Sequence, residues 1–432
     1  MSVAGIVCEY NPFHNGHAYQ IRRLKEDFGM EAVVCAMSGH FMQRGEPAII
    51  HKMTRTRMAL GSGADLVLEL PAMYATRSAY WFALGGLSVL NGTGIVTHLA
   101  FGSETSDLSG LQNAAQRLAH PSPAFRQSLK AHLSQGLSFV AAQAAALAET
   151  SAEAGAENTA AGHAPQPLIP SQPNDRLALT YLQVIAEKGY PLMPILIPRK
   201  GDAYHETVPS RDTGLTSASA IRRLLLNERT PLDASSLAAP ADPVRAFLPK
   251  GSYDLIKAYP HRLVDPQSLA PILMHLLRRA TPEDLRRLPD MTEGLENRII
   301  QCAGLAGTMD EFYQRLKTKR YAMTRLQRAM THLYLNYTND ATHSMEQGSP
   351  YLRVLGCTAK GQALLQQMKS SSTLPVITRA GQLNRLCLHD PHGRSAWELE
   401  MRSGYLYALL QNPDGTTPAA MLEHQLKPIL QA

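Results

Sequence analysis

The sequence predicts an α/β fold over residues 1–230 and a mainly α-helical region over residues 231–432. In the first part, short apolar runs alternate with helical patterns, which favours a parallel sheet with right-handed crossovers. In the second part, strand-like runs are rare and the patterns are mostly helical. A chain of 432 residues has room for roughly two or three domains, so we expect these two parts to be separate domains.

The elements follow from the period of the apolar residues. Strands are expected at five short apolar runs: Gly5–Glu9, Ala32–Met37, Asp65–Leu70, His98–Phe101 and Leu192–Ile197. After the first strand, Ile21, Leu24 and Phe28 have the spacing of one buried helix face. Further helices are expected at Met53–Leu60, Tyr74–Leu90, Pro271–Arg279, Pro282–Leu288, Glu293–Ala303 and Thr324–Asn336.

Residues 142–173 differ from the rest of the first part. They are rich in Ala, Glu, Gly and Pro, and their apolar residues have no period. Such a composition favours a loop over a packed element. We therefore expect a flexible insertion at residues 142–173.

Composition excludes several classes of protein. The apolar share of 44% and the charged share of 18% are typical of a globular protein and exclude disorder over most of the chain. No apolar run approaches the roughly 20 residues of a membrane span, and no leader sequence is visible, so we expect no membrane association. The cysteines form no CxxC pair, which disfavours a zinc site and a disulfide framework and fits the cytoplasm: Cys8, Cys35, Cys302, Cys357 and Cys387. Cys8 is expected to be a small buried apolar residue.

The most specific signal is the run GIVCEYNPFHNGH at residues 5–17, which contains an HxGH motif. It follows the first strand and opens the first helix, where unpaired N–H groups and the helix dipole favour a phosphate. Gly16 lets the backbone approach a ligand, and His14 and His17 can donate to phosphate oxygens as charge builds. A lone histidine here would more often cap the helix, but the full motif favours the phosphate site.

A second signal is TSASAIRR, Thr216–Arg223, a hydroxyl-rich turn that opens a helix. Ser217 or Ser219 can cap that helix, and Arg222 can face the leaving phosphates. Together with HxGH, this turn resembles the paired signature of the HIGH-type nucleotidyltransferase superfamily. Members of that superfamily attack the α-phosphate of a nucleotide and release pyrophosphate.

The chain resembles one family in particular, the bacterial tRNA(Met) cytidine acetate ligases. The resemblance spans residues 5–328 and rests on GIVCEYNPFHNGH, GADLVLELP (63–71), FGSE (101–104), PRKGDAYH (198–205), TSASAIR (216–222), EGLENRI (293–299) and TKRYAMTRLQR (318–328). It implies a Rossmann-like nucleotidyltransferase domain with an added helical region. It also implies an enzyme that makes acetyl-adenylate from acetate and ATP, then acetylates N4 of the wobble cytidine of elongator tRNA(Met).

The same resemblance implies the site residues. His14, His17 and Arg222 would be catalytic. ATP contacts would fall on residues of the first strand–turn–helix and of four later positions: Ile6, Val7, Cys8, Glu9, Tyr10, Asn11, Pro12, Phe13, His14, Asn15, Gly16, His17, Ala18, Tyr19, Gly102, Asn174, Arg199 and Lys200. Mg²⁺ stays open as a cofactor, and no protein partner is expected. The alternative function is adenylation of a small molecule, and a further one is RNA binding without catalysis.

A basic segment lies in the second part. Residues 313–332 hold six Lys or Arg and no acid. On a helix, Met323, Leu326 and Met330 share one face, while Arg325, Arg328 and His332 share roughly the opposite face. We expect tRNA to bind Lys319, Arg320, Arg325 and Arg328; the alternative is a solvated basic face. For Lys52, Arg55 and Arg57 the same two alternatives, contact with phosphates or tRNA and a solvated face, stay open.

Overall fold

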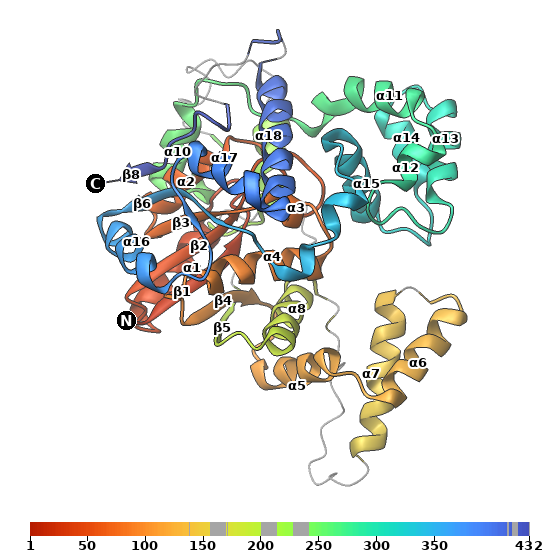
Figure 1. The fold of residues 1–432 in the computed structure, drawn as a ribbon, viewed down its shortest axis with the longest axis horizontal. Coiled ribbons are helices and arrows are strands. Elements are labelled where there is room, and N and C mark those ends of the chain that lie inside the picture. The colour runs from red at the N-terminus through yellow and green to blue at the C-terminus, as the bar shows by residue number, and fades with distance from the viewer. Residues whose placement is uncertain are drawn as a thin grey trace. The chain divides into compact units, whose positions relative to one another are not determined.

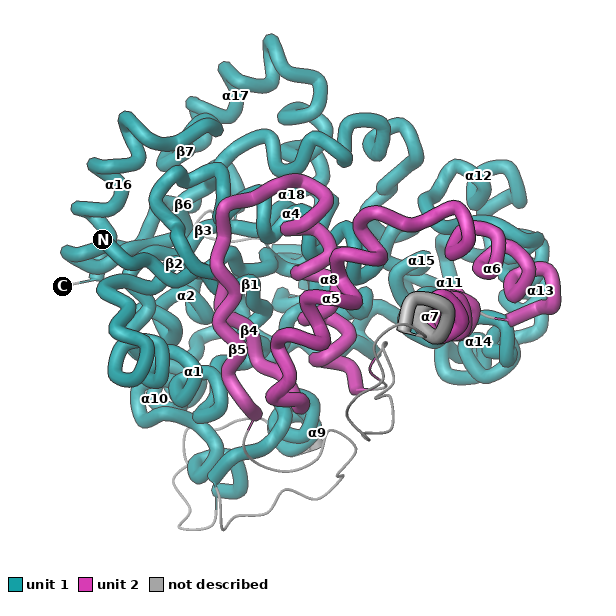
Figure 2. The backbone as a smooth tube through the Cα atoms, turned by 90° about the horizontal axis from the view of Figure 1, so that it is seen from below, with its two compact units in different colours: residues 1–98, 200–432 teal, residues 99–199 magenta. Residues whose placement is uncertain are grey.

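The structure is a computed structural model that describes residues 1–137, 139–155, 170, 172–199, 214–227, 242–412, 414–416 and 422–431. The chain forms two compact units, residues 1–98 with 200–432 and residues 99–199 (Figure 2). The α/β class is confirmed, because strands and helices alternate along the first part of the chain. The expected domain boundary at residue 230 lies outside the described residues and stays a prediction.

The first unit is built on a sheet whose first three strands are parallel: β1 (Val3–Cys8), β2 (Ala32–Ser38) and β3 (Leu66–Leu70). Nearly all of their residues are buried. That burial explains why they are almost continuous apolar runs, since a parallel sheet is covered on both faces. All three strands overlap the predicted runs, although β1 begins at Val3, before the predicted start at Gly5.

The C-terminal part of the chain adds three strands that the sequence analysis did not predict. β6 (Leu352–Thr358) runs antiparallel to β3, and β7 (Val376–Ile377) and β8 (Ile429–Gln431) run parallel to β6. Figure 1 shows β6 and β8 beside the strands of the N-terminal part. Segments about 290 residues apart, such as Leu66 and Cys357, therefore share one sheet.

Two helices near the sheet begin at a histidine whose side chain caps them. α1 (Asn15–Glu26) and α2 (Lys52–Gly61) are each capped by a histidine, His14 and His51. The helix expected at Tyr74–Leu90 is two helices, α3 (Ala72–Ala75) and α4 (Ala79–Gly92). The break lies at Thr76–Ser78, because Ser78 has the extended backbone of an N-cap residue.

Further along, the first unit is mostly helical. α11 to α15 enclose a core of apolar side chains that includes Leu273, Ile299, Phe312 and Leu326. The helices with their bounds are α9 (Ala218–Asn227), α10 (Lys250–Lys257), α11 (Ala270–Arg279), α12 (Pro282–Arg286), α13 (Leu295–Leu305), α14 (Met309–Leu316), α15 (Met323–Leu335), α16 (Ala359–Ser371), α17 (Ala380–His389) and α18 (Pro391–Gln411).

The second unit contains the neighbouring strands β4 (His98–Ser103) and β5 (Met193–Pro198). α5 (Leu108–Ala119) packs on α8 (Pro173–Lys188), and α6 (Pro123–Ser134) packs on α7 (Phe139–Gly155). The expectation of an irregular insertion is wrong for residues 142–155, which belong to α7. Alanine has the highest helix propensity, so this stretch forms a helix without an apolar period.

The rest of the expected insertion is partly outside the described residues and partly helical. Residues 156–169 lie outside the described residues, and residue 173 already belongs to α8. Among the described residues, no helix has both the length and the apolar character that a membrane span requires.

α15 packs against the N-terminal part of the first unit through two polar contacts. The Thr331 hydroxyl donates to the Gly45 carbonyl at 2.8 Å, and His332 Nε2 donates to the Thr76 carbonyl at 2.9 Å. Both side chains are fully buried. The expectation that His332 lies on a basic, exposed face of α15 is therefore wrong, because this helix is buried on two sides.

We expect His332 to make the protein less stable in acid. Burial lowers its pKa to about 4, with a further lowering by the positive charge of Arg77. The unfolded chain takes up a proton near pH 6.5 and the folded chain does not, so stability is lost as the pH falls from about 6.5 to 4. The loss approaches about 3 kcal/mol. Urea unfolding at several pH values should show it, and His332→Gln should flatten the dependence in that window.

Candidate active site

The HxGH motif forms the turn between β1 and α1. His14 is the N-cap of α1: its Nδ1 accepts from the Gly16 N–H at 3.1 Å, and His17 Nδ1 accepts from the His14 N–H at 3.2 Å. A neutral imidazole that accepts at Nδ1 carries its proton on Nε2. Both histidines are therefore assigned as Nε2–H donors, the form that a phosphate oxygen requires.

The two rings have a fixed relative position. The His14 and His17 rings stack with centroids 3.7 Å apart. Tyr10 and Phe13, both buried, contact the His17 ring with centroids 4.7 and 5.4 Å away. A Cβ at Gly16 would lie 2.9 Å from His14 Cε1, so glycine leaves room for the ring. The sequence analysis did not predict this second reason for a glycine at position 16, the room that the His14 ring needs.

Hydrogen bonds connect the second motif, residues 216–223, to the HxGH turn. Arg222 on α9 donates through Nη1 to the Asn11 carbonyl at 2.8 Å, and its Nη2 lies 3.4 Å from Glu46 Oε2. The Asn15 amide donates to the carbonyls of Gly214 and Ala246, each at 2.9 Å. Segments about 200 residues apart in the sequence therefore meet at the start of α1.

The hydroxyls of the second motif divide between two contacts. Ser217 Oγ accepts from the Ala220 N–H at 3.2 Å, which is the contact of a helix cap. Ser219 Oγ lies 3.4 Å from Arg222 Nη2. Ser217 is thus the capping residue of the two, and Ser219 supports the arginine.

Arg55 holds the ends of β1 and β2 in place. It is fully buried and donates to the carbonyls of Glu9 at 2.6 Å, Ser38 at 3.0 Å and Ile50 at 3.1 Å, and to that of Gly39. Neither a phosphate contact nor a solvated face describes this residue, so both alternatives for Arg55 are wrong. Its partners are backbone atoms of other elements, which no local pattern reveals.

Glu9 lies beside the HxGH turn. Its Oε1 accepts from the Gln43 N–H at 2.6 Å. Burial raises its pKa, and the charges of Arg222 and Arg44 act in the opposite direction. The Gln43 N–H and the two arginines therefore stabilise the ionised form of Glu9, which burial disfavours.

Three expected ATP contacts gather in the second unit. Arg199 follows β5 and donates from its backbone N–H to the Ser103 carbonyl at 2.9 Å, and its Nε lies 3.8 Å from Glu104 Oε1. The Asn174 amide donates to the same Glu104 oxygen at 2.5 Å. A Cβ at Gly102 would lie 3.6 Å from Arg199 Cγ. Lys200 lies outside the described residues.

Lys52 lies in a buried cluster of charges. Its Nζ lies 2.5 Å from Glu69 Oε1 and 2.7 Å from Glu423 Oε2. Arg353 Nη1 lies 2.8 Å from Glu69 and 2.6 Å from Glu423. Lys52 is fully buried, so it is neither a phosphate contact nor part of a solvated face, and both alternatives are wrong. Arg57 on the same helix is exposed.

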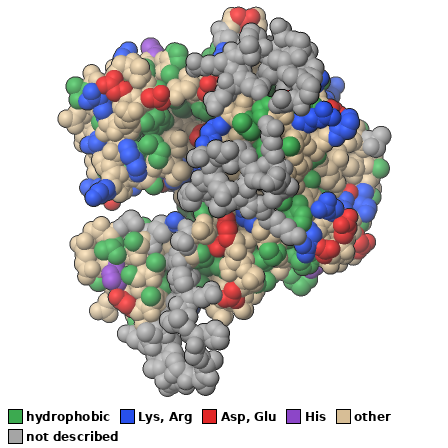
Figure 3. Space-filling model, turned by 180° about the vertical axis from the view of Figure 1, so that it is seen from behind, with side chains coloured by type: hydrophobic (Ala, Val, Ile, Leu, Met, Phe, Trp, Pro, Cys, Tyr) green, Lys and Arg blue, Asp and Glu red, His purple; other side chains and the backbone are tan. Residues whose placement is uncertain are grey.

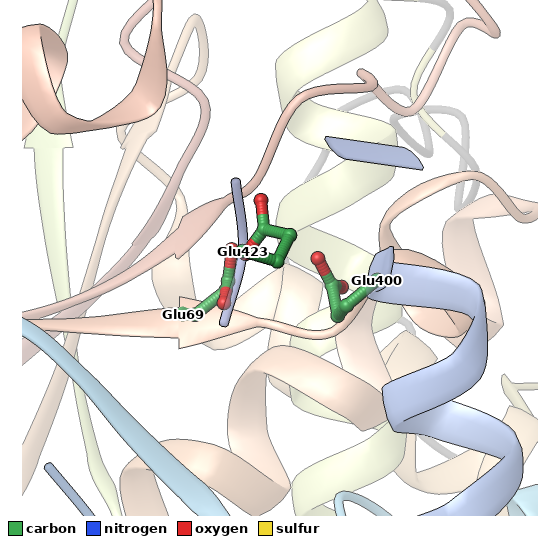
Figure 4. A group of neighbouring side chains, drawn as sticks. All are labelled: Glu69, Glu400 and Glu423. Atoms are coloured by element: carbon green, nitrogen blue, oxygen red, sulfur yellow. The ribbon is translucent and has the colours of Figure 1, made fainter. Parts of the chain in front are cut away.

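The carboxylates of this cluster are the one group among the described residues with metal-ligand spacing: Glu69, Glu400 and Glu423 (Figure 4). Lys52 and Arg353 already supply two positive charges there. Burial raises the pKa of Glu400 to about 8, which keeps that carboxyl neutral at pH 7. With Glu400 neutral, the two negative charges of Glu69 and Glu423 are balanced by the positive charges of Lys52 and Arg353. The cluster therefore needs no metal ion and does not fit a Mg²⁺ site.

The basic segment is less exposed than the sequence suggests. Arg320 is exposed and pairs with Glu293 at 3.1 Å, while Arg325 donates to the Asp290 carbonyl at 2.9 Å. Arg328 is half-buried, and burial lowers its pKa to about 10. In Figure 3, blue Lys and Arg side chains share the surface of the α11–α15 region, at the upper left, with red Asp and Glu side chains. Lys319 is exposed.

A strand–turn–helix with HxGH, met by a helix that carries Arg222, defines a nucleotidyltransferase of the HIGH class. The family model HIGH Nucleotidyl Transferase matches residues 1–419. Within that class, the chain belongs to the family of the tRNA(Met) cytidine acetate ligases. The ligase of Syntrophomonas wolfei is 38% identical over 413 residues, 95% of each chain, and that of Acetivibrio thermocellus is 36% identical over 421 residues, 96% of each chain.

Solved structures are similar over the whole chain. Apo TmcAL of Thermotoga maritima has a TM-score of 0.90 at 28% identity. The same protein bound with alpha-thio ATP has a TM-score of 0.85 at 27% identity. Each comparison covers 100% of this chain and 99% of the other. The expected Rossmann-like nucleotidyltransferase fold is thus confirmed.

Proposed function

We propose that this protein is an ATP-dependent ligase that activates acetate as acetyl-adenylate and transfers the acetyl group to N4 of the wobble cytidine of elongator tRNA(Met). The observation that carries the proposal is the meeting of the HxGH turn with Arg222 in a chain whose relatives over 95% of its length are tRNA(Met) cytidine acetate ligases. Acetate and tRNA are its substrates, and the cytoplasm, where tRNA is modified, is its location.

The first step requires charge neutralisation more than covalent catalysis. An acetate oxygen attacks the α-phosphorus of ATP, the bond to the bridging oxygen breaks, and pyrophosphate leaves with the electron pair. We assign His14, His17 and Arg222 to the phosphate oxygens in this step. Arg222 is already held by the Asn11 carbonyl, so it needs little reorganisation when ATP binds.

The remaining ATP contacts are proposed in two groups. Residues 6–19 would hold the nucleotide at the start of α1, where the helix offers its N–H groups. Gly102, Asn174, Arg199 and Lys200 are the other proposed ATP contacts. The three of these that the structure describes gather around Glu104, which supports treating them as one group.

In the second step, the exocyclic N4 of cytidine attacks the acetyl carbonyl carbon, AMP leaves, and N4 loses a proton. The division of labour that we propose places adenylation in residues 1–230 and tRNA binding in residues 231–432. Lys319, Arg320, Arg325 and Arg328 are the proposed tRNA contacts.

Two assays test the proposed function against its alternative. ATP–pyrophosphate exchange should depend on acetate, and incubation with ATP, acetate and elongator tRNA(Met) should yield N4-acetylcytidine in digested tRNA. Exchange that depends on another small acid and not on acetate would favour the alternative, a small-molecule adenylyltransferase. A chain that binds tRNA but shows no exchange with any acid would contradict both enzymes.

We expect Lys319→Ala with Arg320→Ala to weaken tRNA binding. The logarithm of the tRNA association constant falls linearly with the logarithm of the salt concentration. Each lost cation that contacts a phosphate should make this slope less steep by about one unit. Both side chains are exposed, so the fold should persist. The measurement is tRNA affinity at several salt concentrations. The control is Lys250→Ala, which removes an exposed lysine of α10 and should leave the slope unchanged. If the double variant also leaves the slope unchanged, Lys319 and Arg320 are not part of the tRNA interface.

A further inference from the structure

One loop, residues 289–294, contacts arginines from three segments of the chain. Arg77 comes from the link before α4, and its Nη2 lies 3.6 Å from Asp290 Oδ1. Arg325 on α15 donates to the Asp290 carbonyl at 2.9 Å and to Thr292 Oγ1 at 2.7 Å. Glu293 pairs with the exposed Arg320. The carboxylates and carbonyls of this loop thus take the places that phosphate oxygens would take on a basic surface.

The enclosed part of this contact is poorly satisfied. Arg77 is only 6% exposed. Among the described residues, its Nε and Nη1, Arg328 Nε and Asp290 Oδ2 have no hydrogen-bond partner. The 3.6 Å contact between Arg77 and Asp290 is too long for a strong hydrogen bond. Buried donors without an acceptor are rare in folded proteins because they lose their hydration and gain nothing in return.

The missing acceptor has a definite chemistry. The unpartnered atoms of Arg77 and Arg328 are guanidinium N–H donors, which bind most strongly to negatively charged oxygen acceptors. Two arginines face one carboxylate here, since the charges of Asp290 and Arg77 both act on Arg328. A group with several acceptor oxygens and a negative charge, such as a phosphodiester, would satisfy all three donors at once.

The loop itself is held in an unfavourable backbone. Asp290 and Glu293 have φ angles of 62° and 65°, in the left-handed region that non-glycine residues rarely adopt. Gly294 follows with a φ of 75°. This strain, added to the unpaired donors beneath the loop, lowers the free energy needed to displace it.

We propose that Arg77 and Arg328 form a binding site for a phosphate of the tRNA backbone, and that the loop of residues 289–294 covers this site until tRNA displaces Asp290. The proposal rests on the proposed function, since it names a contact for the same tRNA. Arg320 and Arg325, two of the proposed tRNA contacts, bind the same loop through Glu293 and Asp290. The partly exposed Trp81 ring, 5.8 Å from the Arg77 guanidinium, offers a surface on which a base can stack.

The test removes the charge of the loop and keeps its shape. Asp290→Asn should tighten the binding of elongator tRNA(Met) about 5-fold, because the competing carboxylate is gone. Asparagine accepts the left-handed backbone at least as well as aspartate, so the loop should keep its fold. The matched control is Glu283→Gln, which removes an equal charge from an exposed ion pair on α12. Thermal unfolding of both variants monitors the fold.

A second variant tests whether the tighter tRNA binding of Asp290→Asn requires Arg77. In the background of Arg77→Met, Asp290→Asn should no longer tighten binding, because the group that it releases is missing. A gain no greater than that of Glu283→Gln would overturn the inference, as would a gain that persists without Arg77. If neither the wild type nor Asp290→Asn binds the tRNA, the proposed function fails along with the inference, whereas normal wild-type binding without a gain refutes the inference alone.

Discussion

Replacing His14 or His17 by alanine should lower acetate-dependent pyrophosphate exchange on the order of 100- to 1,000-fold, as loss of a donor to a transition-state oxyanion typically does. Each ring is assigned an Nε2–H donor because its Nδ1 accepts a backbone N–H. The loss should appear mainly in the rate at saturating ATP, since the donors act on charge that develops during the reaction.

Two variants sharpen this prediction. His17→Gln keeps a donor near the position of Nε2 and should retain more activity than His17→Ala. His343→Ala is the control and should exchange at the wild-type rate, because the His343 ring bonds to the Asp340 carbonyl of its own 3₁₀ turn. Wild-type exchange in a His14→Ala, His17→Ala double variant would refute the assignment of these residues to adenylate formation.

The second large effect concerns stability. Lys52→Met should lower the free energy of unfolding by about 3–5 kcal/mol, because it leaves the buried Glu69 and Glu423 with too little positive charge. Arg353 would remain beside both acids, and one of the acids would have to take up a proton. The destabilisation should therefore be smaller at low pH, where that proton is available.

Urea unfolding at pH 7 and pH 5 measures this effect. Lys250→Met is the matched control: its ammonium pairs with Asp254 but is 89% exposed. An exposed pair of this kind contributes about 0–1 kcal/mol. Equal stability of the two variants would show that the buried cluster has no net role in holding the fold together.

The sequence predicted the features that depend on local pattern. β1, β2 and β3 are short apolar runs between turn residues, and HxGH lies at the start of a helix, so neighbouring residues suffice to place them. α7 was missed because an alanine-rich helix has no apolar period. The strands β6, β7 and β8 were missed because each is short and pairs with strands far away in the chain.

The charged residues were harder to predict for a physical reason. Lys52 and Arg55 resemble a solvated basic face of α2 until their partners are known, and one of the two acids that hold Lys52, Glu423, is 371 residues away from it. His332 was placed with Arg325 because a helical pattern identifies one buried face. α15 has two, one on the core of the helical region and one on the Thr76 carbonyl.

The position of Glu423 also bears on synthesis at the ribosome. Lys52 is made early and its ion pair with Glu423 is the contact that closes the cluster beside β3. A nascent chain must therefore keep the Lys52 ammonium hydrated, or hold it with Glu69 alone, until residue 423 has left the exit tunnel. The N-terminal strands β1, β2 and β3 can pair before that moment, but the charge cluster beside β3 can close only afterwards. The buried charges of Lys52 and Glu69 therefore reach their final balance only when a segment far along the chain has folded onto them.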